Sequence, residues 1–154
     1  LHMPTLYVFK PLIFKNKREQ QSYNRLVRNV KRTLPIAKEV NRAIIETYEF
    51  LQTLPDEKAR QKHLNLVEKS VKEQYTPRLK KLSFSQGKLL IKLINRETDS
   101  SSYELVKAFL GPFKAGFYQA FAALFGASLK KEYHPDGEDA LTERIVILVE
   151  NGQL

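Results

Sequence analysis

The feature that most constrains the fold is a long stretch, from Lys17 to Thr53, that contains no glycine. Its apolar residues recur at steps of three and four, which is the spacing of one face of an α-helix. This face consists of Tyr23, Leu26, Val27, Val30, Leu34, Ala37, Val40, Ile44, Ile45, Tyr48 and Leu51. The pattern predicts a long amphipathic helix. We expect Pro35 to kink or split it, because proline lacks the N–H that bonds one turn back.

Start and stop signals predict further helices along the rest of the chain. We expect these helices to begin at Pro55, Ser83, Ser101, Pro112 and about Glu138. The second should break near Thr76-Pro77, and the last should end at Glu150. Ser followed three residues later by Gln or Glu, as at Ser83 and Ser101, is the signature of a capping box.

The segment from Tyr103 to Leu129 is rich in Phe, Gly and Ala. Its uncharged run, Ala115 to Leu129, is fifteen residues long, whereas a membrane span needs roughly 20. Small residues recur within the run at steps of four, three and four, which suits close approach between helices. We therefore predict a central core helix here and no transmembrane span, with membrane or oligomer contact as the alternative.

Together these signals predict an all-α fold: one compact helical domain of about six helices with a central Gly/Ala/Phe-rich helix. A length of 154 residues is typical of one domain. Residues 5–15 are β-branched and aromatic around Pro11, which predicts a short extended arm or edge strand. We assign residues 1–16 to this N-terminal arm and residues 17–154 to the helical domain.

Positive charge is concentrated in the first part of the chain. Residues 1–96 hold 21 Lys/Arg against 8 Asp/Glu, a net +13, whereas residues 97–154 hold 5 against 9, a net −4. The two parts could attract each other within the fold, or the basic surface could meet an external polyanion. Four arginines of the long helix share a face opposite its apolar stripe: Arg18, Arg25, Arg28 and Arg32. They are polyanion-binding candidates, or simply a solvated or internally paired face.

No arrangement of residues predicts a catalytic site strongly. The chain has no Cys, which excludes thiolate chemistry and disulfides, and its three His lack the spacing of metal ligands. We predict no metal and no cofactor. The weak catalytic candidates are Arg96, Glu97, His134, Asp136 and Glu143. Arg96 could instead pair with Glu97, or with Glu143 on the last helix, in a structural polar network.

Three long blocks of the chain, residues 4–20, 81–98 and 101–154, resemble a family of domains of unknown function in Bacteroidota, the one numbered 4294. The resemblance covers essentially the full chain. It implies a small protein that is typically made with an N-terminal signal sequence and exported to the periplasm or cell envelope. It implies no activity and no cofactor, and it assigns a role to no residue.

Three functions remain open. The leading hypothesis is a non-enzymatic helical interaction module of the bacterial cell envelope, whose partner would be an envelope protein or an anionic glycan or lipid surface. The first alternative is an enzyme or ligand-binding protein that uses acidic residues between positions 96 and 143. The second alternative is a polyanion or nucleic-acid binder that acts through the arginine face, although an exported protein would meet little nucleic acid.

Overall fold

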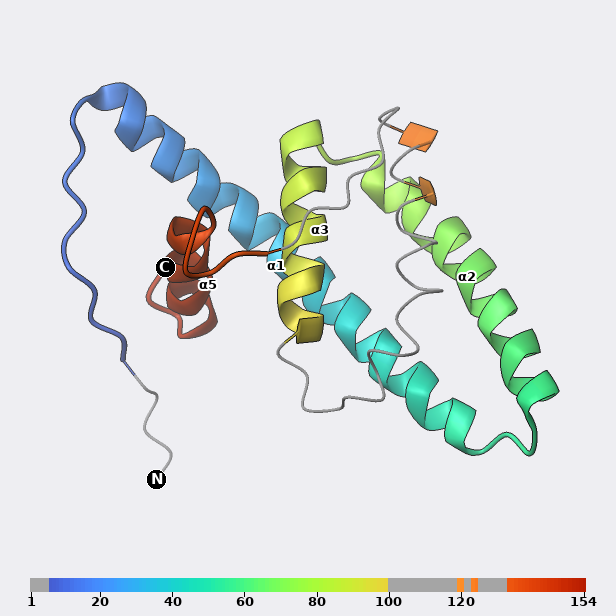
Figure 1. The fold of residues 1–154 in the computed structure, drawn as a ribbon. Helices are drawn as coiled ribbons and strands as arrows, with labels where there is room; N and C mark the ends of the chain where they lie inside the picture. The colour runs from blue at the N-terminus through green and yellow to red at the C-terminus, as the bar shows by residue number, and fades with distance from the viewer. Residues whose placement is uncertain (1–5, 100–118, 121–122, 125–132) are drawn as a thin grey trace.

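The computed structural model describes residues 6–99, 119–120, 123–124 and 133–154. Four helices lie in this part of the chain: α1 (Lys17–Gln52), α2 (Glu57–Leu79), α3 (Phe84–Asp99) and α5 (Ala140–Glu150). Figure 1 shows that α3 crosses the middle of α1, while α2 returns from the far end of α1. No strand is present among the described residues, so the prediction of a helical protein is confirmed.

Helix α1 is one continuous helix of 36 residues. The Asn16 side chain caps its start by accepting a hydrogen bond from the Glu19 N–H at 2.9 Å. Pro35 lies inside the helix without splitting it. Its neighbours Leu34 and Ala37 are buried in the core, and this packing offsets the backbone hydrogen bond that proline cannot make.

Helices α2 and α3 begin at local capping groups. The Asp56 side chain accepts a hydrogen bond from the Ala59 N–H at 2.8 Å. At the start of α3, the Ser83 hydroxyl accepts from the Gln86 N–H, and the Gln86 side chain accepts from the Ser83 N–H. The capping box predicted at Ser83 is therefore confirmed. The break predicted at Pro77 is wrong, because α2 continues through it to Leu79.

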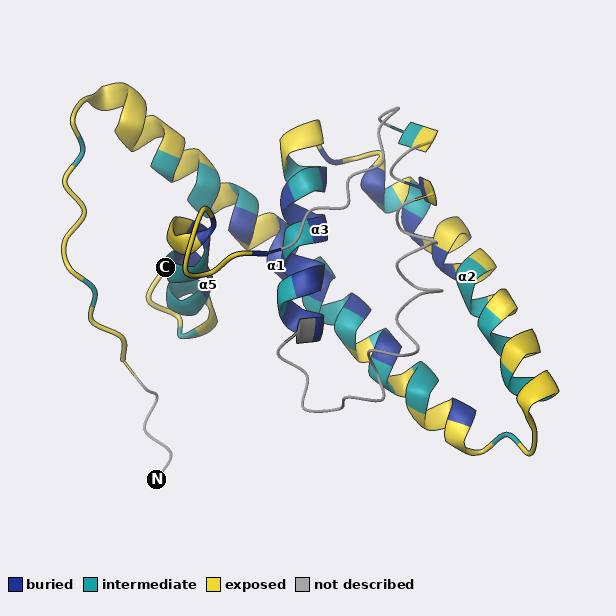
Figure 2. Ribbon diagram, viewed as in Figure 1, coloured by how far each residue is buried: buried dark blue, intermediate teal, exposed yellow. Residues whose placement is uncertain are grey.

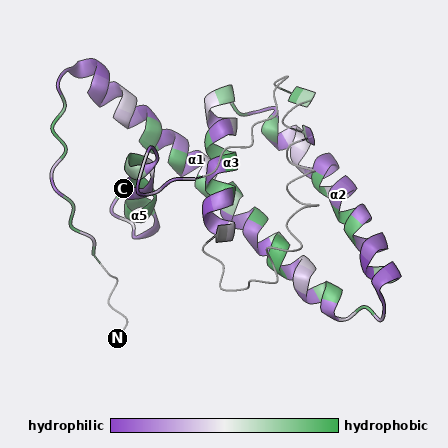
Figure 3. Ribbon diagram, in the orientation of Figure 1, coloured by the Kyte–Doolittle hydropathy of each residue, from purple (hydrophilic) through white to green (hydrophobic). Residues whose placement is uncertain are grey.

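The core lies where α1, α3 and α5 meet. Figure 2 shows buried residues along the inner sides of these helices, and Figure 3 shows that the same sides are hydrophobic. Val30 of α1, Leu90 of α3 and Ile145 of α5 are completely buried. Tyr75 of α2 also belongs to this core, so all four helices contribute to it.

The described residues hold four helices, where the sequence predicted about six. The fourth and fifth expected helices fall in residues 101–129. Of these residues the structure describes 119–120 and 123–124, which are helical. The predicted central Gly/Ala/Phe-rich helix therefore lies almost entirely outside the described residues.

Helix α5 begins at Ala140, two residues after the predicted start, because residues 135–139 form a turn. Among the described helices, none is long and apolar enough to cross a bilayer.

The N-terminal arm, residues 6–14, is neither helix nor strand. It reaches the other end of the chain, where the Gln153 amide accepts a hydrogen bond from the Tyr7 N–H and donates one to the Tyr7 carbonyl, both at 3.0 Å. Phe9 lies under the Arg144 guanidinium at 4.8 Å, and the Phe14 ring lies 5.4 Å from that of Tyr23. The arm is thus held in place at three points.

The fold predicts unequal costs for two leucine truncations. Leu90→Ala removes a side chain that is 0% exposed and should lower the free energy of unfolding by about 3 kcal/mol, since it leaves a cavity. Leu66→Ala, on a residue that is 58% exposed, should change it by less than about 0.5 kcal/mol. Urea unfolding followed by circular dichroism measures both. Equal costs would contradict the packing described for α3.

Candidate functional site

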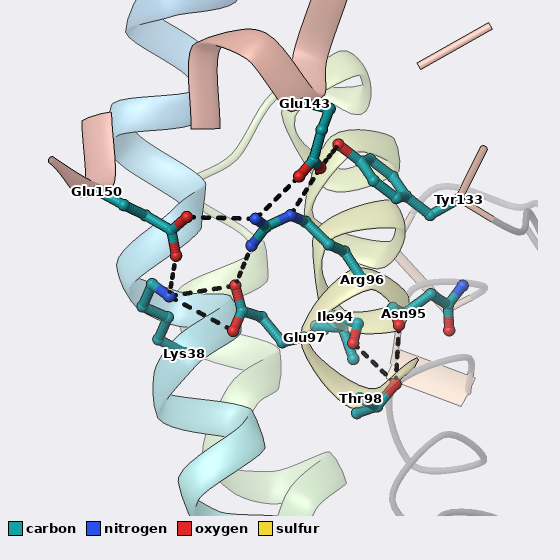
Figure 4. A network of polar contacts seen from close by, with 9 residues as sticks. All are labelled: Lys38, Ile94, Asn95, Arg96, Glu97, Thr98, Tyr133, Glu143 and Glu150. Carbon is teal, nitrogen blue, oxygen red and sulfur yellow. Dashed lines mark hydrogen bonds and ion pairs between the residues drawn. The ribbon is translucent and has the colours of Figure 1, made fainter. Parts of the chain in front are cut away.

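A network of ion pairs joins α3 to α5, with the Arg96 guanidinium at its centre (Figure 4). Arg96 binds Glu143 through two nitrogens: Nε lies 2.8 Å from Oε2 and Nη2 lies 3.1 Å from Oε1. Its Nη1 donates to Glu97 at 2.8 Å, and its Nη2 donates to Glu150 at 3.2 Å. Two-point contact fixes the angle between guanidinium and carboxylate, so this pair is geometrically specific.

Lys38 brings α1 into the same network. Its Nζ lies 2.6 Å from the Glu150 carboxylate and 3.3 Å from that of Glu97. The two carboxylates therefore bridge Lys38 and Arg96, as Figure 4 shows. Because these residues come from α1, α3 and α5, the network connects all three helices. Its two cations and three carboxylates leave a formal charge of −1.

Three groups of the network, Glu143, Tyr133 and Arg96, have pKa values shifted away from neutral pH. Burial would raise the pKa of Glu143, but hydrogen bonds from Arg96 and from the Tyr133 hydroxyl, at 2.6 Å, outweigh burial and lower it. Burial and the nearby Glu143 carboxylate raise the pKa of Tyr133. Burial would lower the pKa of Arg96, yet its carboxylate partners raise it overall. None of these three groups is tuned toward neutral pH, where a general acid or base would operate.

A second set of ion pairs holds the turn before α5. The Lys92 ammonium lies 2.6 Å from Asp139 and 3.4 Å from Glu138. Burial would lower the pKa of Lys92, but these two carboxylates raise it overall. The Asp139 carboxylate also accepts a hydrogen bond from the backbone N–H of His134 at 2.9 Å. These contacts stabilise the turn and fix where α5 begins.

The structure brings together three of the five catalytic candidates. Arg96, Glu97 and Glu143 belong to one network: the sequence offered Glu97 or Glu143 as the partner of Arg96, and the structure shows both contacts. His134 and Asp136 are exposed in the turn before α5 and are not part of it. Among the described residues, no group of three or more His, Cys, Asp or Glu is placed to hold a metal ion.

Sequence reasoning missed three members of the network: Lys38, Tyr133 and Glu150. Lys38 and Glu150 lie 112 positions apart in the chain, and their pairing depends on how α5 lies against α1. A useful signal was available, since residues 97–154 carry an excess of acids over bases that needs cationic partners. That signal identifies the acids but not the lysine that each one meets.

An open groove of about 570 Å³ lies beside the network, between α1 and α5. Leu34, Pro35 and Val149 supply its apolar part, and Lys31 and Arg42 are the cations near it that have no ion pair within the described residues. Lys38 also lines the groove, but Glu97 and Glu150 compensate its charge. The free cations of the groove therefore add to the basic side of α1.

The predicted arginine face occupies the first half of α1, which Figure 2 shows as mostly exposed and Figure 3 as hydrophilic. Arg18, Arg25 and Arg28 are exposed and make no ion pair or hydrogen bond with any described residue. Arg32 is also exposed but donates from Nη2 to the Lys81 carbonyl at 3.2 Å, next to the start of α3. Three of the four candidates are thus free to bind an external group.

The fold and the ion pairs together define a class of protein: a small helical protein whose network acids are paired with lysine and arginine side chains of the fold. The arginine face of α1 has no ion pair with any described residue. A family model identifies the protein further. The family described as Domain of unknown function (DUF4294) matches residues 1–148, and the chain belongs to this family. No curated protein matches the chain, and no solved structure matches it.

The network predicts that Arg96 is a stabilising residue. Arg96→Met should lower the free energy of unfolding by about 3 kcal/mol, because three carboxylates would lose a partner whose side chain is only 16% exposed. The same substitution at the exposed Arg28 should change it by less than about 0.5 kcal/mol. Urea unfolding at pH 7 measures both variants. A small effect at Arg96 would show that the network does not hold α5 to α3.

The lowered pKa of Glu143 predicts a pH-dependent contribution to stability. Because the folded-state pKa lies below the ordinary value of 4.5, the contribution is fully present above that value and is lost as the pH falls through the folded pKa. Unfolding free energies of the wild type and Glu143→Gln, measured from pH 7 down to pH 3, should therefore converge in acid. A difference that stays constant with pH would contradict this assignment.

Proposed function

We propose that this protein is a non-enzymatic interaction module of the bacterial cell envelope that binds an anionic glycan or lipid surface through α1. One observation carries the proposal: Arg18, Arg25 and Arg28 are exposed on one helix and make no ion pair or hydrogen bond with any described residue. Unpaired arginines on one surface attract anionic groups, since a guanidinium can contact a phosphate or carboxylate with two nitrogens.

The distribution of acids supports the same proposal. Glu97, Asp139, Glu143 and Glu150 each contact a lysine or arginine of the fold. They therefore compensate internal cations of α1 and α3 and leave the arginines of the first half of α1 uncompensated. The basic and acidic parts of the chain attract each other at these pairs, while the face used for binding remains positive.

The enzyme alternative has less support. It needs carboxylates that face one cavity and that change protonation near the working pH. Glu143 lies instead in a two-point contact with Arg96, and the pKa of Glu143 is lowered. A general acid would require a raised pKa. The groove beside the network contains Glu97 and Glu150, both of which contact the Lys38 ammonium.

The location in the cell envelope is part of the proposal and rests on the family resemblance. In that compartment the anionic groups available to an arginine face are lipid head groups and acidic glycans, and nucleic acid is the less favoured ligand. Binding through exposed charges is weakened by salt, because each neutralised anionic group releases condensed counterions.

The arginine face predicts a salt-dependent interaction with heparin. The triple variant Arg18→Gln, Arg25→Gln, Arg28→Gln should elute from a heparin column at much lower salt than the wild type. The slope of log affinity against log salt should fall by about one for each arginine removed. Flotation with vesicles that contain phosphatidylglycerol would then distinguish a lipid surface from a glycan.

A matched control removes the same charge from another helix. Lys58, Lys62 and Lys69 are exposed on α2, so the triple variant with Gln at these positions has the same net charge as the arginine variant. We expect it to keep most of its heparin retention. Equal losses in the two variants would show that net charge, and not the α1 face, drives binding, and would contradict the proposal.

A further inference from the structure

We propose that the N-terminal arm is a docking edge onto which an acidic partner protein adds a β-strand, at residues 6–10. This surface is separate from the arginine face of α1 and makes a different kind of contact. The proposal rests on three observations: the arm is held on one side, its other side is apolar and exposed, and its lysines are unpaired.

The arm is held at Tyr7 through its backbone. Both the N–H and the carbonyl of Tyr7 bond to the Gln153 amide. In an extended chain, alternate residues direct these backbone groups to opposite sides, so those of Leu6 and Val8 point away from Gln153. Neither residue makes a hydrogen bond with any described residue. The arm therefore presents an open strand edge.

Two apolar side chains of the arm, next to this edge, are exposed to solvent. Leu6 is 72% exposed and Val8 is 96% exposed, whereas Tyr7 is 42% exposed and Phe9 packs beneath the Arg144 guanidinium. Alternation of this kind places one face of an extended segment on the protein and the other in solvent. Large apolar side chains on a segment that is held in place are a feature of interaction surfaces.

The backbone favours a partner strand over a lipid surface. The unbonded N–H and carbonyl groups of Leu6 and Val8 would have no partner in the hydrocarbon of a bilayer. A strand from another protein would bond to both groups and could cover the apolar side chains at the same time. Pro11 has no N–H and limits this edge to the residues before it.

Charge indicates which partner strand fits. Lys10, the last residue of the edge, is exposed and forms no ion pair with any described residue, and the same holds for Lys15 beyond Pro11. A second copy of this chain carries the same net charge of +9, so like charges disfavour self-pairing. A strand that alternates apolar and acidic residues would match both the exposed apolar side chains and the positive charge of the arm.

A synthetic peptide of alternating valine and glutamate is a direct probe. It should bind the wild-type protein at concentrations below about 1 mM and should slow hydrogen exchange at the Val8 amide, measured by NMR. Val8→Pro removes that N–H and should weaken binding at least about tenfold. Val8→Thr keeps the N–H and should bind nearly as the wild type does. Because proline favours an extended conformation in the residue before it, Val8→Pro leaves Tyr7 able to contact Gln153.

Several outcomes would overturn the proposal. The proposal fails if the valine–glutamate peptide does not bind detectably, or if a valine–lysine peptide binds equally well. It also fails if a valine–glutamate peptide with an N-methylated backbone binds fully. Finally, it fails if sedimentation shows a dimer of the protein that Val8→Pro abolishes. The triple arginine variant should bind the valine–glutamate peptide at no less than about half the wild-type affinity. A larger loss of affinity would show that the peptide binds at the arginine face of α1 and not at the arm. Failure of heparin binding would leave the arm proposal standing, since the two surfaces share no residue.

Discussion

The alignment of α5 against α3 depends on one guanidinium, that of Arg96. It lies at the contact between α3 and α5 and binds carboxylates from both helices. Removing a partly buried arginine from three acids is costly, whereas apolar contacts can shift and adapt. The hydrophobic core brings α3 and α5 together. The two-point contact with Glu143 then selects one alignment of the two helices, because a guanidinium and a carboxylate bind only over a narrow range of angles.

The same network determines which charges the surface presents. The acids of α5 contact Arg96 of α3 and Lys38 of α1, so the charge asymmetry of the chain is compensated on one side of the molecule. Along the first half of α1, Arg18, Arg25 and Arg28 have no carboxylate partner among the described residues and keep their full charge. A basic surface therefore coexists with acids elsewhere in the fold because those acids are already bound. This separation of charge is the main reason to favour binding over catalysis.

Sequence reasoning succeeded where the signal is local. The amphipathic stripe of α1 and the capping box at Ser83 are set by residues a few positions apart, and both are present. A split at Pro35 is absent, because the cost of a proline is local whereas the packing that offsets it comes from other helices. The pairing of Arg96 with Glu143 could be predicted from charge. The participation of Lys38 could not, since it depends on the position of α5 against α1.

The place of Glu143 and Glu150 in the chain has a consequence for biosynthesis. Of the described helices, α5 is the last to be synthesised, yet it supplies carboxylates to Arg96 of α3 and Lys38 of α1. Until α5 emerges from the ribosome, α1 and α3 carry an excess of positive charge at the contact that they will later form. Domains generally fold as units once their parts are available. The final docking of α1 and α3 with α5 must therefore follow synthesis of α5, and until then Arg96 and Lys38 lack the carboxylates that α5 supplies.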